Sequence, residues 1–406
     1  MPQPDRQFRF ASALSESADL ARALDEVDEQ LAARLSDRAD LVAVFVTPHH
    51  IEGLGVLQDR LLRRFEPRAL VGSTAESVVG RRREAEGKPA VSVLAAQMPG
   101  AHLRPVVWDE RDFDAMLADP DAAKAATATD GGAARLVVLL ADPFTTPLTR
   151  LLPRWAQTLP GVPFVGGVCS GTRTPGGNRL WCNGRLVQSG AVALTLGPGV
   201  QTRFTVSQGC RPVGSPLVVT RTRDDRNYIV AELGGRNALG AIRTMIQGLH
   251  ENEQAIVQSS GLLVGCVINE YKQRFGRGDF LIRGIVGVDQ DAGHVAIGEP
   301  DLKVGQTIQL HVRDQGTARE DFALLLEAHK LDGPGDDGSA GGLLFTCNGR
   351  GRNLFDEPDT DAALVHDALG DMPLAGFFAA GEIGPVGPRS YLHGHTASLL
   401  VLRPED

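Results

Sequence analysis

The sequence predicts an α/β fold in which mixed β-sheets are covered by helices. Two observations support this prediction. Short apolar, β-branched runs alternate with amphipathic segments of helical period along most of the chain. A unit of strand, helix, short glycine-containing strand and long outgoing strand also occurs three times. A layered αββα sandwich built from repeated β-α-β-β units is one arrangement that accommodates both observations.

The three copies of this unit share a glycine in the second strand. Their strands are predicted at 41–47, 70–73 and 91–95, at 136–141, 164–167 and 190–196, and at 343–346, 374–377 and 397–402. In each copy the first strand lies about thirty residues before the recurring glycine, which is the scale of one supersecondary unit. The repeat therefore predicts three similar building blocks.

The elements of the first half follow from local patterns. Residues 1–14 are expected to form an extended lead-in, and Ser15 or Ser17 to cap a helix that runs to about residue 35. Further helices are predicted at 51–65, within 118–134, and at 148–158. Strands are predicted at 41–47, 69–72, 90–97, 103–108, 136–141, 164–168, 185–195 and 201–207.

The second half shows the same alternation of apolar strands and amphipathic helices. Helices are predicted at 240–246, 317–329 and 361–369. Strands are predicted at 228–233, 261–267, 280–289, 306–313, 343–346, 374–378 and 397–402. With 406 residues the chain is long enough for more than one domain, and a change in composition near residue 225 divides it. We expect an N-terminal extension with its helix at 1–38, and domains at 39–225 and 226–406.

Composition excludes several functions. The net charge of −9 argues against binding to nucleic acid or to an acidic membrane surface. The cluster Arg81-Arg82-Arg83 stands beside Glu84 and Glu86 and is interpreted as a solvated hairpin tip. No apolar run approaches about 18 residues, so no membrane span is expected. The sequence has no dinucleotide or phosphate-loop fingerprint, and we expect no cofactor.

The five cysteines indicate a reducing compartment. They are widely spaced, odd in number and form no C-x-x-C motif. This pattern favours free thiols over a disulfide framework or a structural zinc site, and predicts a cytoplasmic protein. Cys169 lies in Gly167-Val168-Cys169-Ser170-Gly171, which matches a nucleophile elbow with cysteine in place of serine. The glycines and proline after it do not open a helix, so we interpret Cys169 as a packed small residue.

Polar side chains concentrate at the ends of the last three predicted strands. They are Cys347, Asn348, Arg350, Glu382, His393 and His395. Arginine offers a planar fork that suits a carboxylate or phosphate. Two histidines two residues apart share one face if their segment is extended. We predict that these residues line a ligand site. The ligand set is too mixed in type and spacing to predict a metal.

A second polar pair lies in the middle of the chain. Asp279 and Arg283 are four residues apart on a predicted strand and therefore face the same side. They are expected either to form a surface pair or to provide a second wall of the ligand site.

The tail residues admit other interpretations. Arg350 and Glu382 could pair with each other and fix two loops. Cys347 could also be the thiolate nucleophile of an enzyme, with Arg350, Glu382 and His393 in its site. A scaffold protein whose partner binds an exposed face is a third possibility.

At these residues the chain resembles the FIST proteins, which carry paired FIST N and FIST C domains. The C-terminal resemblance rests on GLLFTCNGR at 342–350, PLAGFFAAGEIGPVG at 373–387, LHGHT at 392–396 and DFLIRGIVG at 279–287. The N-terminal half is similar at 71–74, 163–170 and 190–196. The resemblance covers about residues 40–403.

The resemblance implies a sensory protein that binds a small ligand such as an amino acid. Some relatives join this module to signalling or F-box domains, whereas this chain is expected to be a stand-alone sensor. We therefore expect a small-molecule ligand, a signalling protein as partner and no catalytic residues. Arg350 would bind a ligand carboxylate, and Glu382 would bind an ammonium group or orient Arg350. His393, His395 and Asn348 would supply hydrogen bonds.

Overall fold

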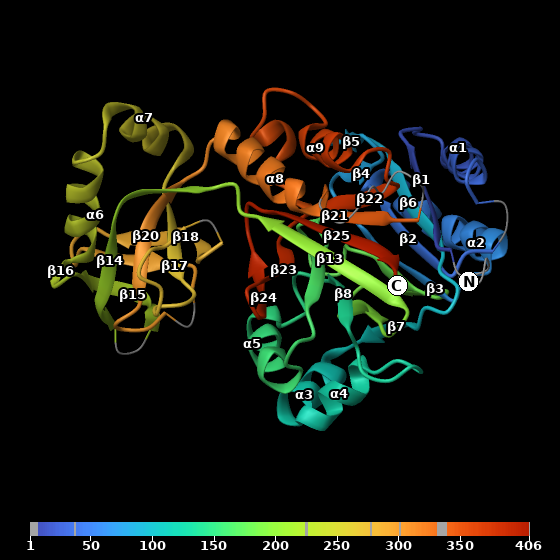
Figure 1. Cartoon of the computed structure of the whole chain (residues 1–406), viewed down its shortest axis with the longest axis horizontal. Coiled ribbons are helices and arrows are strands. Elements are labelled where there is room, and N and C mark those ends of the chain that lie inside the picture. The colour runs from blue at the N-terminus through green and yellow to red at the C-terminus, as the bar shows by residue number, and fades with distance from the viewer. Residues whose placement is uncertain are drawn as a thin grey trace. The chain divides into compact units, whose positions relative to one another are not determined.

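The chain forms two compact units (Figure 1). The computed structural model describes residues 7–35, 38–223, 226–276, 278–299, 302–330 and 339–405. The first unit draws on residues 1–207 and 322–406, and the second on residues 208–321. The domain boundary expected at residue 225 lies outside the described residues. None of the described helices is long and apolar enough to cross a membrane.

The first unit contains the three predicted copies, and each builds the centre of its own sheet. In every copy the first strand pairs with the second in parallel and with the third antiparallel. The strands are β2 (Leu41–Val46), β3 (Ala69–Thr74) and β6 (Val91–Gln97), then β8 (Leu136–Ala141), β9 (Phe164–Val168) and β12 (Ala191–Leu196), then β21 (Gly341–Cys347), β22 (Leu374–Ala379) and β25 (Ala397–Pro404). The α/β class and the threefold repeat are confirmed.

The recurring glycine has the same role in all three copies. Gly72, Gly166 and Gly376 stand opposite Val44, Leu139 and Leu344 on the parallel first strand. A Cβ atom at any of the three would collide with the carbonyl oxygen of that opposite residue. Only glycine permits this close approach of two backbones.

Each copy gives a β-hairpin to the sheet of another copy. The hairpins are β4 (Val78–Gly80) with β5 (Arg83–Ala85), β10 (Leu180–Cys182) with β11 (Arg185–Val187), and β23 (Glu382–Val386) with β24 (Arg389–His393). The first hairpin joins β22, the second joins β3 and the third joins β9, each antiparallel. The exchange is cyclic and ties the first copy to the third, far away in sequence.

A further strand completes each six-stranded sheet at its opposite edge. These strands are β1 (Arg9–Ser15), β7 (Leu103–Trp108) and β13 (Val200–Ser207), which pair antiparallel with β6, β12 and β25. The first unit therefore has three mixed sheets where a two-layered sandwich would have two.

The three sheets enclose one shared apolar core, which includes Phe45 of the first copy, Leu140 of the second, and Phe345 and Phe377 of the third. The rings of Phe45 and Phe377 lie 5.0 Å apart. Burial on both faces explains why the central strands are continuous apolar runs.

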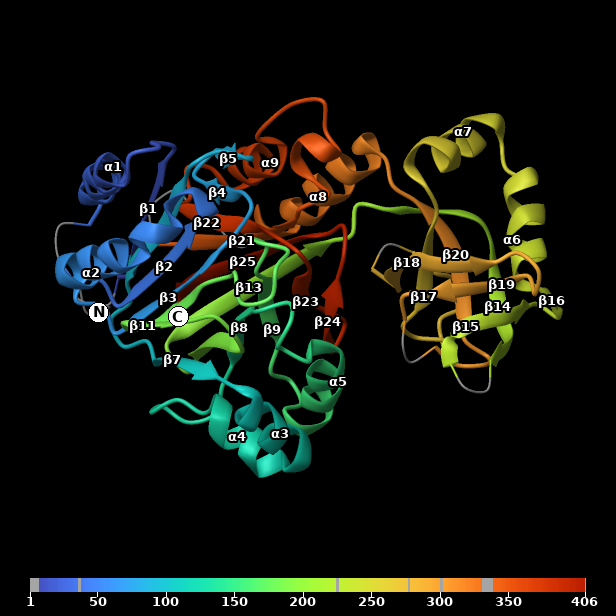
Figure 2. The same cartoon turned by 180° about the vertical axis from the view of Figure 1, so that it is seen from behind.

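Helices cover the outer face of each sheet and form three groups around the strands (Figure 2). The groups are α1 (Leu20–Ala32) with α2 (Leu54–Phe65), α3 (Glu110–Ala118) with α4 (Pro120–Thr127) and α5 (Leu148–Thr158), and α8 (Gln315–Lys330) with α9 (Thr360–Leu369). The helix predicted after Ser15 or Ser17 begins later, because Asp19 is its N-cap. Of the extended lead-in predicted at 1–14, residues 1–6 lie outside the described residues, and residues 9–14 belong to β1, which ends at Ser15.

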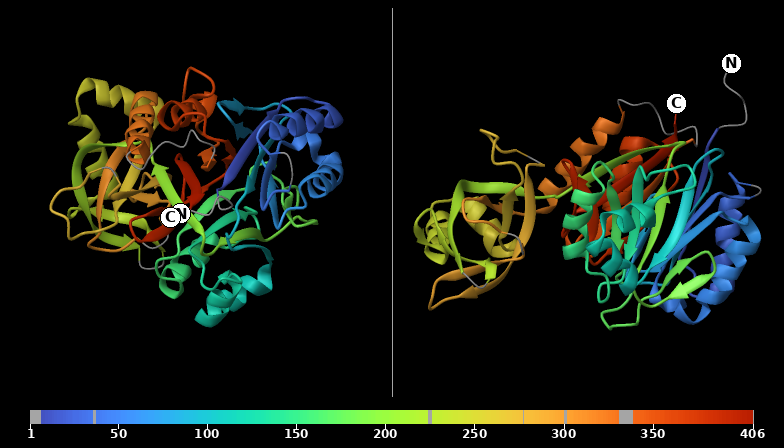
Figure 3. Two further views of the ribbon diagram at one scale, coloured as in Figure 1. Left: turned by 45° about the vertical axis from the view of Figure 1, so that its right-hand side comes forward. Right: turned by 90° about the horizontal axis from the view of Figure 1, so that it is seen from below.

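The second unit is an antiparallel barrel with two helices (Figure 3). Of the strands described, six form a closed ring, because β14 pairs with both β20 and β15. The ring follows β14 (Arg211–Arg223), β20 (Thr307–Val312), β17 (Leu263–Val267), β18 (Phe280–Asp289), β19 (His294–Ile297) and β15 (Arg226–Leu233). The short β16 (Arg236–Asn237) pairs with β15, and the helices are α6 (Ala238–Gln247) and α7 (Glu251–Ser260). Closure satisfies the backbone groups that an open sheet edge would expose.

Candidate functional site

Arg350 is fully buried and bound to a carboxylate of its own chain. Its Nε and Nη2 donate to Oδ2 and Oδ1 of Asp361, both at 2.7 Å, and both side chains are 0% exposed. The guanidinium lies 5.3 Å from the ring centre of Phe355 and 6.0 Å from that of Phe322. Asp361 is in the first turn of α9, so the pair fastens the loop after β21 to this helix.

This geometry corrects the alternative in which Arg350 forms an ion pair with Glu382. The partner of Arg350 is Asp361 and not Glu382. The predicted binding of a ligand carboxylate by Arg350 would require Asp361 to give up a two-point interaction. Nη1 of Arg350 has no hydrogen-bond partner among the described residues.

Glu84 extends this network into the exchanged hairpin. Its Oε1 accepts a hydrogen bond from Ala362 N at 3.0 Å, and its own backbone N–H donates to Asp359 at 2.7 Å. Burial raises the pKa of Glu84, and the negative charge of Asp361 raises it further. At neutral pH the protonated form of Glu84 is therefore favoured, which leaves Arg350 and Asp361 as a balanced pair.

Glu382 is a second buried carboxyl group. It is 0% exposed, and its Oε2 accepts hydrogen bonds from the backbone N and the Oγ1 of Thr396 at 3.0 and 2.8 Å. Burial raises the pKa of Glu382 to about 8, although the hydrogen bonds from Thr396 and Cys347 act in the opposite direction. Oε1 has no hydrogen-bond partner among the described residues. Glu382 is therefore a predominantly neutral acid at pH 7.

Cys347 is the partly exposed member of the tail cluster. Its thiol hydrogen bonds to Glu382, and its Sγ accepts from Gly349 N at 3.4 Å. The other four cysteines are buried, and all five are free. Cys169 is 0% exposed and burial raises the pKa of its thiol, in line with its interpretation as a packed residue.

The structure separates the two histidines. His393 is the last residue of β24, stands opposite Glu382 in the register and lies 2.9 Å from Gly384 O through Nε2. His395 lies beyond the strand in a left-handed conformation with φ of 68°. The sequence predicts that His393 and His395 share one strand face if their segment is extended. That condition is not met, because the chain turns out of the strand before His395.

Other predicted residues have partners elsewhere. Asn348 donates to Glu76 Oε2 at 3.1 Å and so connects the third copy to the first. Asp279 and Arg283 belong to the second unit, where Asp279 pairs with Lys272 and Arg283 pairs with Glu299 at 2.8 Å. No group of histidine, cysteine and acidic residues among the described positions is arranged to hold a metal.

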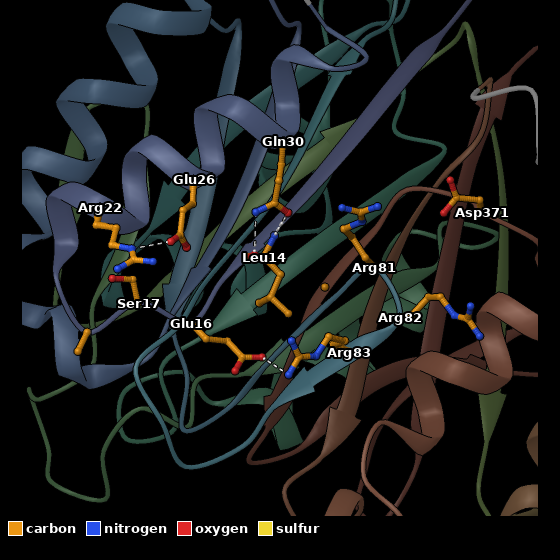
Figure 4. Close-up of a pocket in the computed structure, with 12 residues that line it drawn as sticks. Leu14, Glu16, Ser17, Arg22, Glu26, Gln30, Arg81, Arg82, Arg83 and Asp371 are labelled. Atoms are coloured by element: carbon orange, nitrogen blue, oxygen red, sulfur yellow. Dashed lines mark hydrogen bonds and ion pairs between the residues drawn. The ribbon is translucent and has the colours of Figure 1, made fainter.

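A pocket that the sequence analysis did not predict lies between α1 and the hairpin β4–β5 (Figure 4). Its volume is about 720 Å³, and a smaller hollow of about 300 Å³ shares Gln30, Arg81 and Asp371 with it. The walls come from the end of β1 and the loop after it, one side of α1 along most of its length, the hairpin tip and the turn before β22. The lining residues are Leu14, Glu16, Ser17, Ala18, Arg22, Glu26, Gln30, Gly80, Arg81, Arg82, Arg83 and Asp371.

The predicted hairpin tip at Arg81-Arg82-Arg83 is confirmed, and its side chains are exposed. The tip is also one wall of this pocket. The neighbouring Glu84 is not solvated, because its side chain points into the protein and the residue is 4% exposed. The only signal in the sequence was the density of arginines, which does not indicate what packs against them.

Comparisons with known proteins identify the family. The FIST N domain model matches residues 40–236 and the FIST C domain model matches residues 238–385. The chain belongs to the FIST family. Uncharacterized protein Rv0628c of Mycobacterium tuberculosis is 39% identical to this FIST protein over 97% of the chain and 99% of its own length. Uncharacterized protein Mb0898c of Mycobacterium bovis is 38% identical over 97% of the chain and 98% of its own length. FIST domains are associated with the sensing of small ligands in signal transduction.

Proposed function

We propose that this FIST protein is a cytoplasmic sensor that binds a small metabolite, with amino acids as the first candidates, in the pocket between α1 and the hairpin β4–β5. The observation that carries the proposal is the pocket itself. Its volume of about 720 Å³ falls within the range of roughly 300–1,000 Å³ that is usual for ligand sites. Charged groups of both signs line it, which suits a small polar molecule.

The hairpin offers a route from the pocket to the tail cluster. Arg83 lines the pocket, whereas its neighbour Glu84 is bound to the first turn of α9 beside Asp361 and Arg350. We propose that the tail residues support the binding wall and pass ligand occupancy to α9. A signalling protein that reads this change would be the partner. The cytoplasmic location is supported by the five free cysteines.

Isothermal titration calorimetry tests the proposal. The full chain is titrated with a panel of amino acids and related small metabolites. We expect saturable binding of at least one compound to the wild type, and weaker binding after substitution of pocket residues. A folded protein that binds no member of the panel would contradict the proposed function.

A catalytic role for Cys347 is the second candidate function. The observation that favours it is the partly exposed thiol in contact with Glu382, a carboxyl group able to exchange a proton near neutral pH. The rate of reaction with a thiol-specific reagent tests this role, and the Cys347→Ser variant shows whether the reacting thiol is Cys347. A nucleophile should react faster than a free thiol at pH 7. A Cys347 rate at or below that of a free thiol contradicts catalysis by this residue.

A further inference from the structure

Arg81 is held at the hairpin tip in a conformation that few side chains adopt. Its φ is 56°, in the left-handed region, and its backbone N–H donates to Leu374 O at 2.9 Å. The preceding Gly80 pairs with Ala375 of β22, so the tip is anchored to the third sheet. The anchored backbone fixes where the Arg81 side chain leaves the hairpin, and Figure 4 shows it between Gln30 and Asp371 at the pocket.

The other arginines at the pocket already have acidic partners. Arg22 pairs with Glu26 at 2.9 Å, Arg83 pairs with Glu16 at 2.9 Å and Arg82 lies 3.8 Å from Asp367. The Arg81 side chain, in contrast, forms no hydrogen bond or ion pair with any residue that the structure describes. An arginine without a partner at a pocket wall is available to a ligand.

The carboxylates of the pocket are equally engaged. Glu16 pairs with Arg83 and with Lys88, Glu26 with Arg22, and Asp371 with Arg34 at 2.5 Å. Four arginines face three carboxylates among the lining residues, and the ion-pair partners from outside the lining add two positive charges and one negative charge. The pocket therefore carries an excess of positive charge, which suits a ligand carboxylate. Each of its lining carboxylates already has a cationic partner, with which a ligand ammonium group would have to compete.

We propose that the pocket selects its ligand by a carboxylate group, that Arg81 is the side chain that pairs with this group, and that a ligand amino group is dispensable. The inference rests on the proposed function, because it assigns the ligand class of the same pocket. A guanidinium can hold a carboxylate with two parallel hydrogen bonds. The amide of Gln30 does not compete for this role, since it bonds to both Leu14 N and Leu14 O, at 3.1 and 3.0 Å.

Matched trios of small molecules test the inference by calorimetry on the full chain. One trio is phenylalanine, 3-phenylpropanoate and phenethylamine, and another is leucine, 4-methylpentanoate and isopentylamine. The two carboxylates of a trio should bind with similar affinity and the amine should not bind. Arg81→Gln should weaken the carboxylates by about 5-fold or more, because this is the scale of a solvent-accessible ion pair. Arg81→Lys should restore part of the loss.

Arg63→Gln is the matched control, because it removes the same charge from an exposed position on α2. Thermal unfolding of both glutamine variants establishes that they fold. If an amine binds as tightly as its carboxylates, or if Arg81→Gln leaves carboxylate affinity unchanged, the carboxylate assignment is overturned while the sensor function stands. If no member of any trio binds although a member of the amino-acid panel does, the carboxylate assignment is overturned and the sensor function stands. If nothing in the trios or the panel binds, the proposed function is contradicted as well.

Discussion

Arg350 and Asp361 form a two-point ion pair with no exposure to solvent, and each nitrogen–oxygen distance is 2.7 Å. The pair joins the loop after β21, a central strand of the third copy, to the helix α9 that covers this sheet. Breaking a buried pair of this kind is costly, because the remaining partner is an uncompensated charge in the protein interior.

Removing one partner should therefore be costly. We expect Arg350→Met to lower the free energy of unfolding by about 3–5 kcal/mol, because Asp361 would be left fully buried without its ion-pair partner. The double variant Arg350→Met with Asp361→Leu should be more stable than the single variant. Urea unfolding measures both, and Arg63→Gln provides the surface control. A decrease of less than about 1 kcal/mol in the free energy of unfolding of Arg350→Met would show that the pair does not stabilise the fold.

Stability should also depend on the protonation of Glu382. Its pKa is raised from 4.5 to about 8 by burial, so the folded state holds a proton that the unfolded chain has lost over this range. The stabilising contribution is complete below pH 4.5 and is lost as the pH rises towards 8. Glu382 should contribute up to about 1.4 kcal/mol per pH unit to the slope within that window, in addition to the contribution of Glu84, whose pKa burial also raises.

Glu382→Gln removes this titration. The variant resembles the neutral acid in shape, and its urea midpoint should fall less than that of the wild type between pH 5 and pH 8. Parallel slopes for the two proteins would mean that Glu382 is ionised in the folded state.

The recurring glycines should tolerate no side chain. Gly376→Ala places a Cβ atom against the Leu344 carbonyl, and we expect a loss of about 1–3 kcal/mol or failure to fold. Gly55→Ala is the matched control, because Gly55 is exposed on α2 with nothing within 4 Å of the added atom. The control should gain up to about 1 kcal/mol, since alanine favours a helix. Equal effects at both positions would refute the shared role of the glycines.

The sequence predicts the repeated sheets well because their central strands are unusually clear. The strands at 136–141 and 164–168 and the helix at 148–158 match the structure residue for residue. Strands buried on both faces are continuous apolar runs, and this pattern is local. The hairpin exchange is not local. The three-residue β4 is too short to give a periodic signal, and its partner β22 lies almost three hundred residues further along the chain.

The site was harder to predict for the same reason. Asp361 is the first-turn acid of a helix, a common place for a carboxylate, so nothing in the sequence marks it as the partner of Arg350. Glu84 follows three arginines and resembles a surface residue until the hairpin is placed on α9. The pocket exists because α1 lies beside an exchanged hairpin, and no local sequence pattern predicts that these two elements are neighbours.

The most direct test of the account is a crystal structure of the protein with the tightest-binding carboxylate of the trios. The account predicts ligand density between α1 and the hairpin β4–β5, with the carboxylate about 3 Å from the guanidinium nitrogens of Arg81. Density at the tail cluster around Cys347 and Glu382, with the pocket at Arg81 empty, would contradict it.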